Sequence, residues 1–262
     1  MTDLPQFAPP AAAVTFVGAG PGSAQHLTLG AYRALQGADV VVHDRLVGVE
    51  VLALIPGHVR RIEMGKAGFG PSTAQDQINA TLVAEALTGA RVVRLKGGDC
   101  GIFGRLDEEI EALVAAGIGF AILPGLTAAC VAAAAIGQSL SKRGRNAALR
   151  VITGHDMDGF AEQDWRGMAR AGEVAAIYMG KASARFIQGR LLMHGAAADT
   201  PVTLVENVSL PGQRILAATL ATLPEAALAL DGPAVILYGL SPRRAVATLS
   251  NATLPQLKEA RA

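Results

Sequence analysis

The sequence contains few charged residues and few aromatic residues. Charged residues make up 17% of the chain and the net charge is +1, so no overall field favours nucleic acid or an anionic membrane surface. Aromatic residues amount to 4%, which is too few for a surface that stacks on bases. We therefore expect a small-molecule partner, with no nucleic-acid partner and no membrane partner.

Cysteine is almost absent, and its placement excludes the usual cysteine sites. Cys100 and Cys130 are the only cysteines, and neither lies in a C-x-x-C motif or a Cys/His cluster. Reduced thiols are typical of cytoplasmic proteins, so we expect a cytoplasmic location. Cys130 falls in an alanine-rich helical pattern and is expected in the core. The five histidines are scattered without ligand spacing, so no metal site is predicted.

No segment has the pattern of a secretory signal or of a membrane span. The first 13 residues contain three prolines and no basic residue, which predicts a loose leader. Residues 117–137 carry no charge and are long enough to cross a bilayer, but Pro124-Gly125 interrupt them. They predict a buried strand over 120–123 and a helix of small residues over 127–136.

Short apolar segments alternate with helical patterns along the chain. In the first half this alternation predicts crossover units around a largely parallel sheet, and in the second half a mixed sheet. The predicted strands cover 14–17, 38–42, 59–63, 91–95, 120–123, 149–153, 174–178, 202–206, 213–217 and 234–238, and the predicted helices 27–36, 48–54, 73–87, 106–116, 127–136 and 222–230. We expect an α/β fold with two domains, 14–136 and 146–244, joined by the basic segment 137–146.

Two side chains within these helical patterns carry specific expectations. In the helix predicted over 106–116, Glu109 falls on a polar position together with Glu108 and Glu111. Trp165 is expected to pack a helix at the start of the second domain. We therefore expect Glu109 on the surface and Trp165 in the core, and neither in a functional site.

Glycine-bearing loops follow several predicted strands and indicate a binding pocket. Gly18 to Ser23 follow the first strand, and Lys96 to Arg105, with four glycines, follow the fourth. A third loop, Pro124 to Ala128, follows the fifth strand. Glycine allows a positive φ or a close approach of the backbone to a ligand. Since ligands bind beyond the carboxyl ends of strands in open α/β sheets, the loops predict one shared pocket.

The first of these loops leaves a second function open. Gly18-Ala19-Gly20-Pro21-Gly22-Ser23 nearly matches the dinucleotide fingerprint G-x-G-x-x-G, and Asp44 stands where an acid could bind a ribose. An NAD or FAD oxidoreductase is therefore a competing hypothesis. Against it, Pro21 stiffens the loop and Gly22-Ser23 delay the helix whose N-terminus a pyrophosphate needs. A tight turn without ligand is the third interpretation of this loop.

Several motifs in order resemble those of the tetrapyrrole methylase family, from about Val14 to Gly239. They are Val-Gly-Ala-Gly-Pro-Gly at 17–22, His-Asp-Arg-Leu-Val at 43–47, Gly-Lys at 65–66, Val-Arg-Leu-Lys-Gly-Gly-Asp at 93–99, Phe-Gly-Arg at 103–105, Pro-Gly-Leu-Thr-Ala at 124–128, Thr-Gly-His at 153–155, Tyr-Met-Gly at 178–180 and Val-Glu-Asn at 205–207. The resemblance implies a two-domain α/β methyltransferase that binds S-adenosylmethionine in the cleft between its domains and forms a homodimer. S-adenosylhomocysteine would be the product form of this cofactor.

The resemblance also implies roles for individual residues. Asp44 and Lys66 would be the acid/base pair, while Arg105 and Glu108 would face the macrocycle as further catalytic residues. Arg45 and Arg143 would bind substrate. The implied cofactor contacts are Pro21, Gly97, Gly98, Asp99, Ile102, Thr127, Ala128, Met179 and Val208. Most of these side chains are small or apolar, so the contacts are expected to be largely through the backbone.

The implied reaction is methylation of uroporphyrinogen III at two pyrrole carbons to give precorrin-2, at the entry to sirohaem and cobalamin synthesis. The eight carboxylates of that substrate call for arginines, which grip carboxylates in a bidentate manner. Three further segments depart from the family pattern, at 100–101, 106–107 and 141–142. They leave open a later precorrin methylase or a tetrapyrrole-binding paralogue without turnover.

Overall fold

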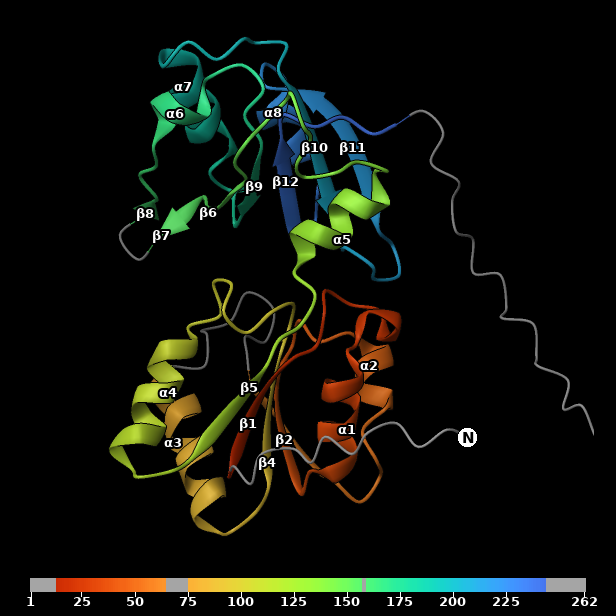
Figure 1. The fold of residues 1–262 in the computed structure, drawn as a ribbon, viewed down its shortest axis with the longest axis vertical. Coiled ribbons are helices and arrows are strands. Elements are labelled where there is room, and N and C mark those ends of the chain that lie inside the picture. Colours follow the sequence, from red (N-terminus) through yellow and green to blue (C-terminus); the bar gives the residue numbers. More distant parts are fainter. Residues whose placement is uncertain (1–12, 65–74, 157–158, 244–262) are drawn as a thin grey trace, which may run out of the picture.

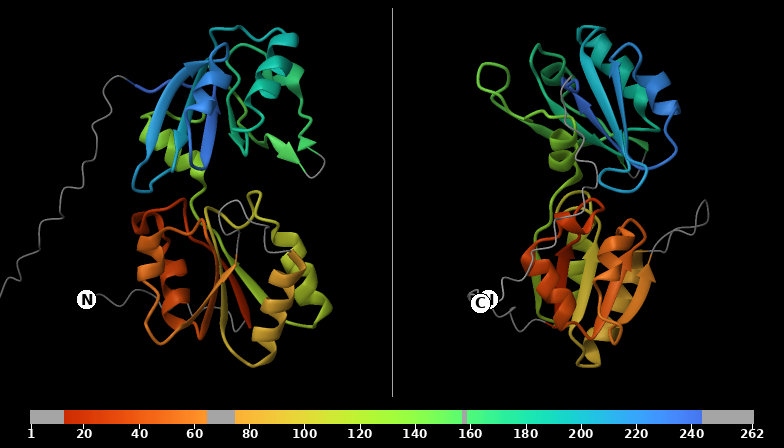
Figure 2. Two further views of the ribbon diagram at one scale, coloured as in Figure 1. Left: turned by 180° about the vertical axis from the view of Figure 1, so that it is seen from behind. Right: turned by 90° about the vertical axis from the view of Figure 1, so that its right-hand side faces the viewer.

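Two five-stranded sheets, one formed by each half of the chain, make up the molecule (Figure 1). The structure is a computed structural model, and it describes residues 13–64, 75–156 and 159–243. Figure 2 shows the two sheets in separate layers above one another, joined by the segment between β5 and α5. Helices cover the sheets, so each half buries apolar clusters of its own.

The N-terminal sheet is entirely parallel, as the alternating pattern predicts. Its strand order is β3-β2-β4-β1-β5, which places β4 at the centre with β2 and β1 on its two sides. The strands are β1 (Val14–Gly18), β2 (Val40–Asp44), β3 (Arg60–Met64), β4 (Val92–Lys96) and β5 (Phe120–Leu123). Their carboxyl ends face the C-terminal half in Figure 1, so the loops that follow them meet at that edge.

Helices cover both faces of this sheet because each strand is followed by a crossover. Thr28 caps the first long helix by accepting a hydrogen bond from the Ala31 N–H at 3.1 Å. The helical elements are η1 (Ala24–His26), α1 (Leu29–Gly37), α2 (Val49–Ala53), α3 (Gln75–Leu87) and α4 (Leu106–Ala115). One apolar cluster joins the sheet to α1 and α2, and another joins it to α3 and α4.

The C-terminal sheet is mixed, which confirms the prediction for the second half. Its order is β11-β10-β12-β9-β6, and only β6 and β9 run parallel to each other. The strands are β6 (Arg150–Thr153), β9 (Ala175–Tyr178), β10 (Pro201–Glu206), β11 (Arg214–Thr219) and β12 (Ala234–Tyr238), with the short pair β7 (His155–Asp156) and β8 (Gly159–Phe160). The helices are α6 (Trp165–Met168), α7 (Ala184–Met193) and α8 (Leu223–Leu228). Trp165 begins α6 and is buried in their common core, as expected.

The helix after β5 belongs to the core of the second sheet. α5 (Ala128–Ala135) packs against β9, β10 and β12 through Ala129, Ala132 and Ile136. The chain therefore crosses between the sheets at residues 124–127, ahead of the crossing predicted at 137–146. That later segment forms a turn of the C-terminal half, closed by pairing between Lys142 and Asn146.

The expectation that Cys130 lies in the core is wrong. Cys130 is exposed on α5, whereas its neighbours Ala129 and Val131 are buried. The helix consists almost entirely of small apolar residues, so its sequence carries no polar stripe that marks the outer face. None of the helices among the described residues is long and apolar enough to cross a membrane.

Three strand ends of the first sheet meet backbone to backbone. A Cβ on Gly18 would lie 2.5 Å from the Gly125 nitrogen and 2.8 Å from the Gly98 carbonyl oxygen. A Cβ on Gly125 would lie 2.3 Å from that same oxygen. Gly18 and Gly125 have no room for a side chain, and Gly98 has a positive φ that favours glycine, so the close packing of the ends of β1, β4 and β5 depends on glycine in all three loops.

We expect Gly18→Ala to lower the free energy of unfolding by about 2–3 kcal/mol, because the clash is with backbone atoms that cannot rotate away. Urea unfolding followed by circular dichroism measures this change. Gly119→Ala is the matched control: a Cβ there meets no atom within 4 Å, so stability should change by less than about 0.5 kcal/mol. Equal stability of the two variants would contradict the close approach.

Candidate active site

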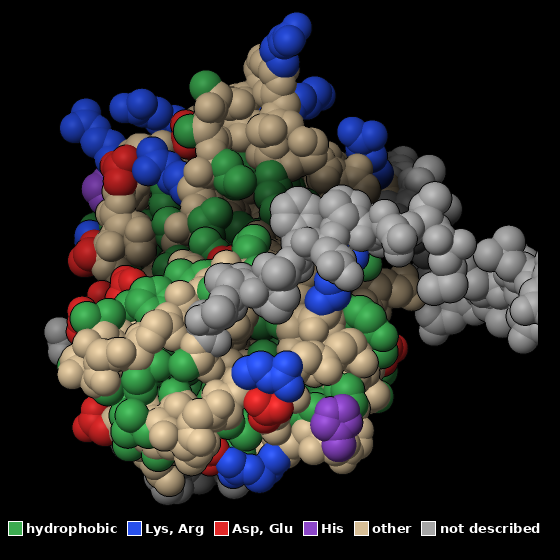
Figure 3. Space-filling view, turned by 60° about the horizontal axis from the view of Figure 1, so that its bottom comes forward, with side chains coloured by type: hydrophobic (Ala, Val, Ile, Leu, Met, Phe, Trp, Pro, Cys, Tyr) green, Lys and Arg blue, Asp and Glu red, His purple; other side chains and the backbone are tan. Residues whose placement is uncertain are grey.

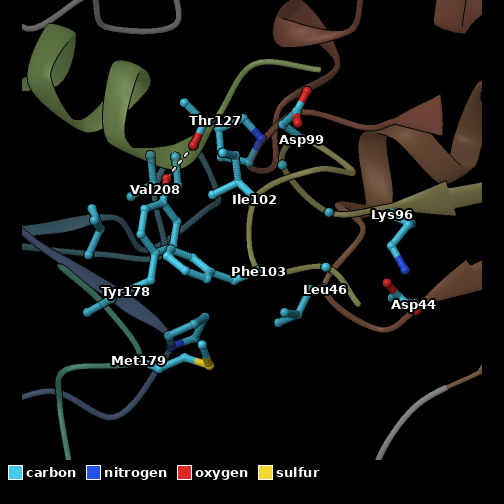
Figure 4. A pocket seen from close by; sticks show the side chains of 18 of the residues that line it. Asp44, Leu46, Lys96, Asp99, Ile102, Phe103, Thr127, Tyr178, Met179 and Val208 are labelled. Carbon is cyan, nitrogen blue, oxygen red and sulfur yellow. Dashed lines mark hydrogen bonds between the residues drawn. The ribbon is translucent and has the colours of Figure 1, made fainter. Parts of the chain in front are cut away.

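A pocket of about 280 Å³ lies between the two sheets, close to the lower end of the range of roughly 300–1,000 Å³ for small-molecule sites. We call it the central pocket. Its lining comes from both halves of the chain (Figure 4). The lining residues are Pro21, Asp44, Leu46, 96–99, 102–104, Thr127, Ala128, Tyr178, Met179, Asn207, Val208, Leu210 and 233–235. On the face drawn in Figure 3, hydrophobic side chains lie between the two halves, and Lys and Arg side chains project from the upper half.

The residues predicted to contact a cofactor come together in this pocket. They arrive on five segments that are far apart in the sequence. Those that line the pocket are Pro21, Gly97, Gly98, Asp99, Ile102, Thr127, Ala128, Met179 and Val208, which is every position predicted for the cofactor. The geometry therefore allows one ligand to contact them all.

The Gly97-Gly98-Asp99 loop is held in place by its own hydrogen bonds. Gly98 has φ +71°, its N–H donates to the Gly20 carbonyl at 2.8 Å, and its carbonyl accepts from the Gly20 N–H at 3.1 Å. Asp99 accepts from the Gly101 N–H and, with its other oxygen, from the Gly125 N–H, each at 2.9 Å. The expected backbone contacts to a ligand therefore do not include the N–H of Gly98, which is already used inside the protein.

Tyr178 connects the second sheet to the start of α5, and it is absent from the predicted site residues. Its hydroxyl accepts a hydrogen bond from the Ala129 N–H at 2.9 Å and shares another with the Thr127 hydroxyl. Its ring centroid lies 5.3 Å from that of Phe103, on the loop of the first sheet. Burial raises the pKa of Tyr178, against the opposing effect of its hydrogen bonds. The motif Tyr-Met-Gly at 178–180 contains this residue, but only the fold places its hydroxyl on another loop.

Backbone strain is concentrated around the pocket. Among the described residues, five that are not glycine have positive φ, and three of them, Phe103, Met179 and Asn207, line the pocket at 52°, 51° and 50°. Such conformations cost about 1–3 kcal/mol each and persist where the surroundings hold them, most often at functional sites. The pocket wall is therefore shaped at a cost in stability.

Asp44, predicted as one half of the acid/base pair, lines the central pocket. It is the last residue of β2, and its side chain is 31% exposed. Figure 4 shows its carboxylate beside Lys96 and across the pocket from Met179. Lys66, the other predicted member, lies outside the described residues.

The predicted substrate-side residues lie away from the pocket lining. Arg105 forms a two-bonded pair with Glu108 at 2.7 and 2.6 Å, and both side chains are about half exposed. The hydrogen bond from Arg105 lowers the pKa of Glu108. Arg45 pairs with Glu63 at 2.5 Å, also half exposed, and Arg143 is exposed in the turn at 142–146. The structure thus brings the cofactor positions and Asp44 together, but not these four residues.

The expectation that Glu109 faces solvent is wrong. Its side chain is 1% exposed and accepts hydrogen bonds from Arg94 at 3.0 Å and from Lys96 at 2.6 Å. Arg94 also donates to Asp44 at 2.7 Å. These four side chains, which we call the buried charge cluster, lie on β2, β4 and α4. Sequence periodicity could not identify this cluster, because a glutamate that neutralises buried bases and a glutamate on the surface are the same residue type.

The acids of the buried charge cluster keep Arg94 ionised. Burial by itself lowers the pKa of Arg94, but the nearby charges and hydrogen bonds of Asp44 and Glu109 outweigh it, so that the pKa is raised. Two bases and two acids face one another, and the cluster is neutral overall.

No set of three or more His, Cys, Asp or Glu side chains in the described part of the chain could hold a metal ion.

The glycine loop after β1 lacks the geometry of a dinucleotide site. Gly20 is bonded to Gly98 in both directions, and the chain continues through η1 before α1 begins at Leu29. A pyrophosphate at Gly18 to Gly22 would therefore not meet a helix N-terminus, which the dinucleotide motif supplies. This geometry disfavours the competing oxidoreductase hypothesis.

Comparison with known proteins is consistent across sequence and structure. The sequence pattern of the tetrapyrrole (corrin/porphyrin) methylases matches residues 13–224. Uroporphyrinogen-III C-methyltransferase of Paracoccus denitrificans is 48% identical over 86% of this chain and 79% of its own length. The crystal structure of uroporphyrin-III C-methyltransferase from Thermus thermophilus, complexed with S-adenosylhomocysteine, has a TM-score of 0.74 at 35% identity and covers 86% of this chain and 96% of the other.

Longer relatives match as well. Siroheme synthase 3 of Aeromonas hydrophila is 48% identical over 86% of this chain, but the match takes up 48% of that protein. The chain thus spans about half the length of the siroheme synthases that it matches.

We expect Glu109→Gln to lower the free energy of unfolding by about 3–5 kcal/mol, because it leaves two buried bases with one carboxylate. Chemical denaturation measures the loss. Glu111→Gln, an exposed acid on the same helix, is the matched control and should change stability by less than about 0.5 kcal/mol. A loss no larger than the control's would contradict the burial of Glu109.

The two thiols should differ sharply in reactivity. Burial raises the pKa of the Cys100 thiol to about 12, whereas Cys130 is exposed. With Ellman's reagent at pH 8, we expect the folded protein to release one equivalent of chromophore and the unfolded protein two. Cys130→Ser should abolish the signal of the folded protein. A persistent fast signal in that variant would show that Cys100 is accessible.

Proposed function

Because this chain belongs to the tetrapyrrole (corrin/porphyrin) methylase family, we propose that it methylates ring carbons of a tetrapyrrole with S-adenosylmethionine as donor. The observation that carries the proposal is the central pocket, in which all positions predicted for the cofactor converge. The solved relative with bound S-adenosylhomocysteine, at 35% identity, supports the choice of cofactor.

The residues of the central pocket fit such a cofactor. An added Cβ on Gly98 meets no atom within 4 Å, so this glycine leaves the wall of the pocket open for a ligand. The apolar side chains of Ile102, Met179 and Val208 suit an adenosine ring, and the Thr127 hydroxyl offers a polar contact. When bound, the cofactor would supply an electrophilic methyl group.

The protein's part in the reaction is alignment and proton removal. Apolar walls formed by Leu46, Phe103 and Met179 would exclude water and hold the macrocycle against the donor. A ring carbon that gains a methyl group leaves the macrocycle with a proton to lose. Two carboxylates line the pocket, Asp44 and Asp99, and both oxygens of Asp99 already accept hydrogen bonds from backbone N–H groups. We therefore assign the acceptance of that proton to Asp44. Lys66 is proposed as its partner.

Uroporphyrinogen III is the proposed substrate and precorrin-2 the proposed product, in sirohaem or cobalamin synthesis. The names of the relatives support this choice. Its carboxylates would bind the arginines predicted from the family, Arg45, Arg105 and Arg143. Arg105 would exchange its bond to Glu108 for one to the substrate, because both lie exposed beyond the pocket lining.

Assembly and location are part of the same proposal. We propose a cytoplasmic homodimer whose chain folds as two domains, with the boundary near residues 124–127, where the chain passes from one sheet to the other. The packing of α5 on the second sheet supports this boundary. Light scattering at micromolar concentration tests the homodimer, and a mass near 26.9 kDa, that of one chain, would contradict it.

The experiment that tests the function is incubation with uroporphyrinogen III and S-adenosylmethionine, followed by mass spectrometry. Two added methyl groups are expected. One added group would indicate altered processivity. None, with S-adenosylhomocysteine still bound, would favour a later precorrin methylase or a binding paralogue. Binding of NADH without S-adenosylhomocysteine, in parallel titrations, would overturn methyl transfer.

Substitutions should separate the cofactor side from the substrate side. Arg105→Ala should lower turnover by about 100-fold, since it removes a carboxylate contact, and leave the affinity for S-adenosylhomocysteine within about twofold. Gly98→Val should weaken that affinity by at least about tenfold, because its side chain projects into the pocket and its φ is positive. Calorimetric titration and initial rates measure both. Arg166→Ala, an exposed arginine on α6, is the control. Loss of cofactor binding in Arg105→Ala would reverse the assignment.

A further inference from the structure

The carboxylate of Asp44 is held by one hydrogen bond within the described part of the chain. Arg94 Nη2 donates to Asp44 Oδ1 at 2.7 Å. The side chain is 31% exposed and lines the central pocket, so the carboxylate is fixed on one side and open to the pocket on the other. A proton acceptor needs this arrangement, because a freely rotating carboxylate reaches the substrate only part of the time.

Arg94 itself has no freedom to move. Its side chain is 2% exposed, and it donates from Nε to Glu109 Oε2 and from Nη2 to Glu109 Oε1, each at 3.0 Å. Lys96 Nζ donates to the same Glu109 Oε1 at 2.6 Å. The bases lie on β4, the central strand of the parallel sheet, and Glu109 lies on α4, which covers it. Glu109 therefore braces Arg94, and Lys96 braces Glu109.

The charges are balanced only when Asp44 is included. Arg94, Lys96 and Glu109 are buried and carry one positive charge in excess, which the carboxylate of Asp44 neutralises. A buried ion cluster of this kind contributes little to stability compared with apolar side chains of the same volume. The excess positive charge is neutralised by Asp44, whose side chain lines the pocket. This placement indicates that the cluster serves the site rather than the stability of the core.

Arginine is required at this position by geometry. Its planar fork donates to carboxylates on two different elements, Asp44 on β2 and Glu109 on α4. The residue two positions further along β4, Lys96, bonds to Glu109 instead. A lysine ammonium is a point charge on a flexible stem and lacks the paired donors of the guanidinium.

We propose that Arg94, braced by Glu109 and Lys96, is a positioning residue that holds the Asp44 carboxylate in one orientation towards the central pocket. This inference rests on the proposed function, in which Asp44 accepts the proton. Arg94 is not among the residues that line the central pocket, so in this proposal it acts only through Asp44.

A double-mutant cycle separates this role from a structural one. Arg94→Lys keeps the charge and should lower kcat by about 10- to 100-fold while KM and the affinity for S-adenosylhomocysteine stay within about twofold. In the Asp44→Ala background the same substitution should have no further effect on kcat, because nothing is left to position. An equal loss in both backgrounds, or an unchanged kcat in the first, would overturn the proposal.

The chain offers a matched control pair directly before the same two strands. Arg91 pairs with Asp39 through two bonds at the opposite end of β2 and β4, where both side chains are about half exposed or more. Arg91→Lys and Asp39→Ala should leave turnover unchanged. Glu109→Asp is the second test variant, which withdraws the brace without removing a charge. Its loss of turnover should also vanish in Asp44→Ala, and a loss that persists there would count against the proposal.

A measurement without turnover distinguishes this proposal from the proposed function. Crystal structures of the wild type and of Arg94→Lys should show one rotamer of Asp44 in the first and two or more in the second. The same single rotamer in both would overturn the positioning role, whether or not the enzyme methylates. If Asp44→Ala turns over at the wild-type rate, the proton-accepting role of Asp44 fails, and the positioning role fails with it. If the wild type transfers no methyl group, the proposed function fails, and the rotamers still decide whether Arg94 orients Asp44.

Discussion

The contact between the backbones of Gly18, Gly98 and Gly125 is the constraint on which the central pocket depends. Gly18 ends β1, while Gly98 and Gly125 follow β4 and β5, and a Cβ on Gly18 or Gly125 would overlap main-chain atoms of the neighbouring loops. The paired hydrogen bonds between Gly20 and Gly98 and the two bonds of Asp99 then fix the loops to one another. Most backbone N–H groups of these loops therefore already donate hydrogen bonds within the protein. A ligand at this wall of the pocket would be bound mainly by shape complementarity and apolar contacts.

The opposite wall is built by the second sheet, and the link between the two is short. The segment at 124–127 carries the chain across, and α5 packs at once on the second sheet. Tyr178 holds the start of that helix through Thr127 and Ala129, while its ring contacts Phe103 from the first half. Loops from both halves therefore share contacts around the pocket.

Charge is distributed unequally around the pocket. In the buried charge cluster, Asp44 is partly exposed to the pocket while Arg94 and Glu109 are almost fully buried, whereas the pair Arg105 and Glu108 is about half exposed and does not line the pocket. Buried pairs are weakly screened and keep their geometry, while exposed pairs exchange partners readily. This contrast suits a base held in one place and a separate, adaptable region for an anionic substrate.

The sequence by itself determined the order and type of nearly all elements of both sheets, because apolar alternation and glycine punctuation are local signals. The glycine loops after the strands predicted a shared pocket, and the family resemblance supplied the individual positions expected to contact the cofactor, all of which line that pocket. Tertiary structure alone decided the rest. Glu109 looks like a surface acid until α4 lies over Arg94 and Lys96, and Tyr178 gains its partners only when β9 meets α5. The exposure of Cys130 and the position at which the chain crosses between the sheets depended on which face of the alanine-rich helix packs inward. Small apolar residues around the whole helix do not encode that choice locally. Partners that lie far apart in the chain are chosen by packing, and packing is a property of the whole fold.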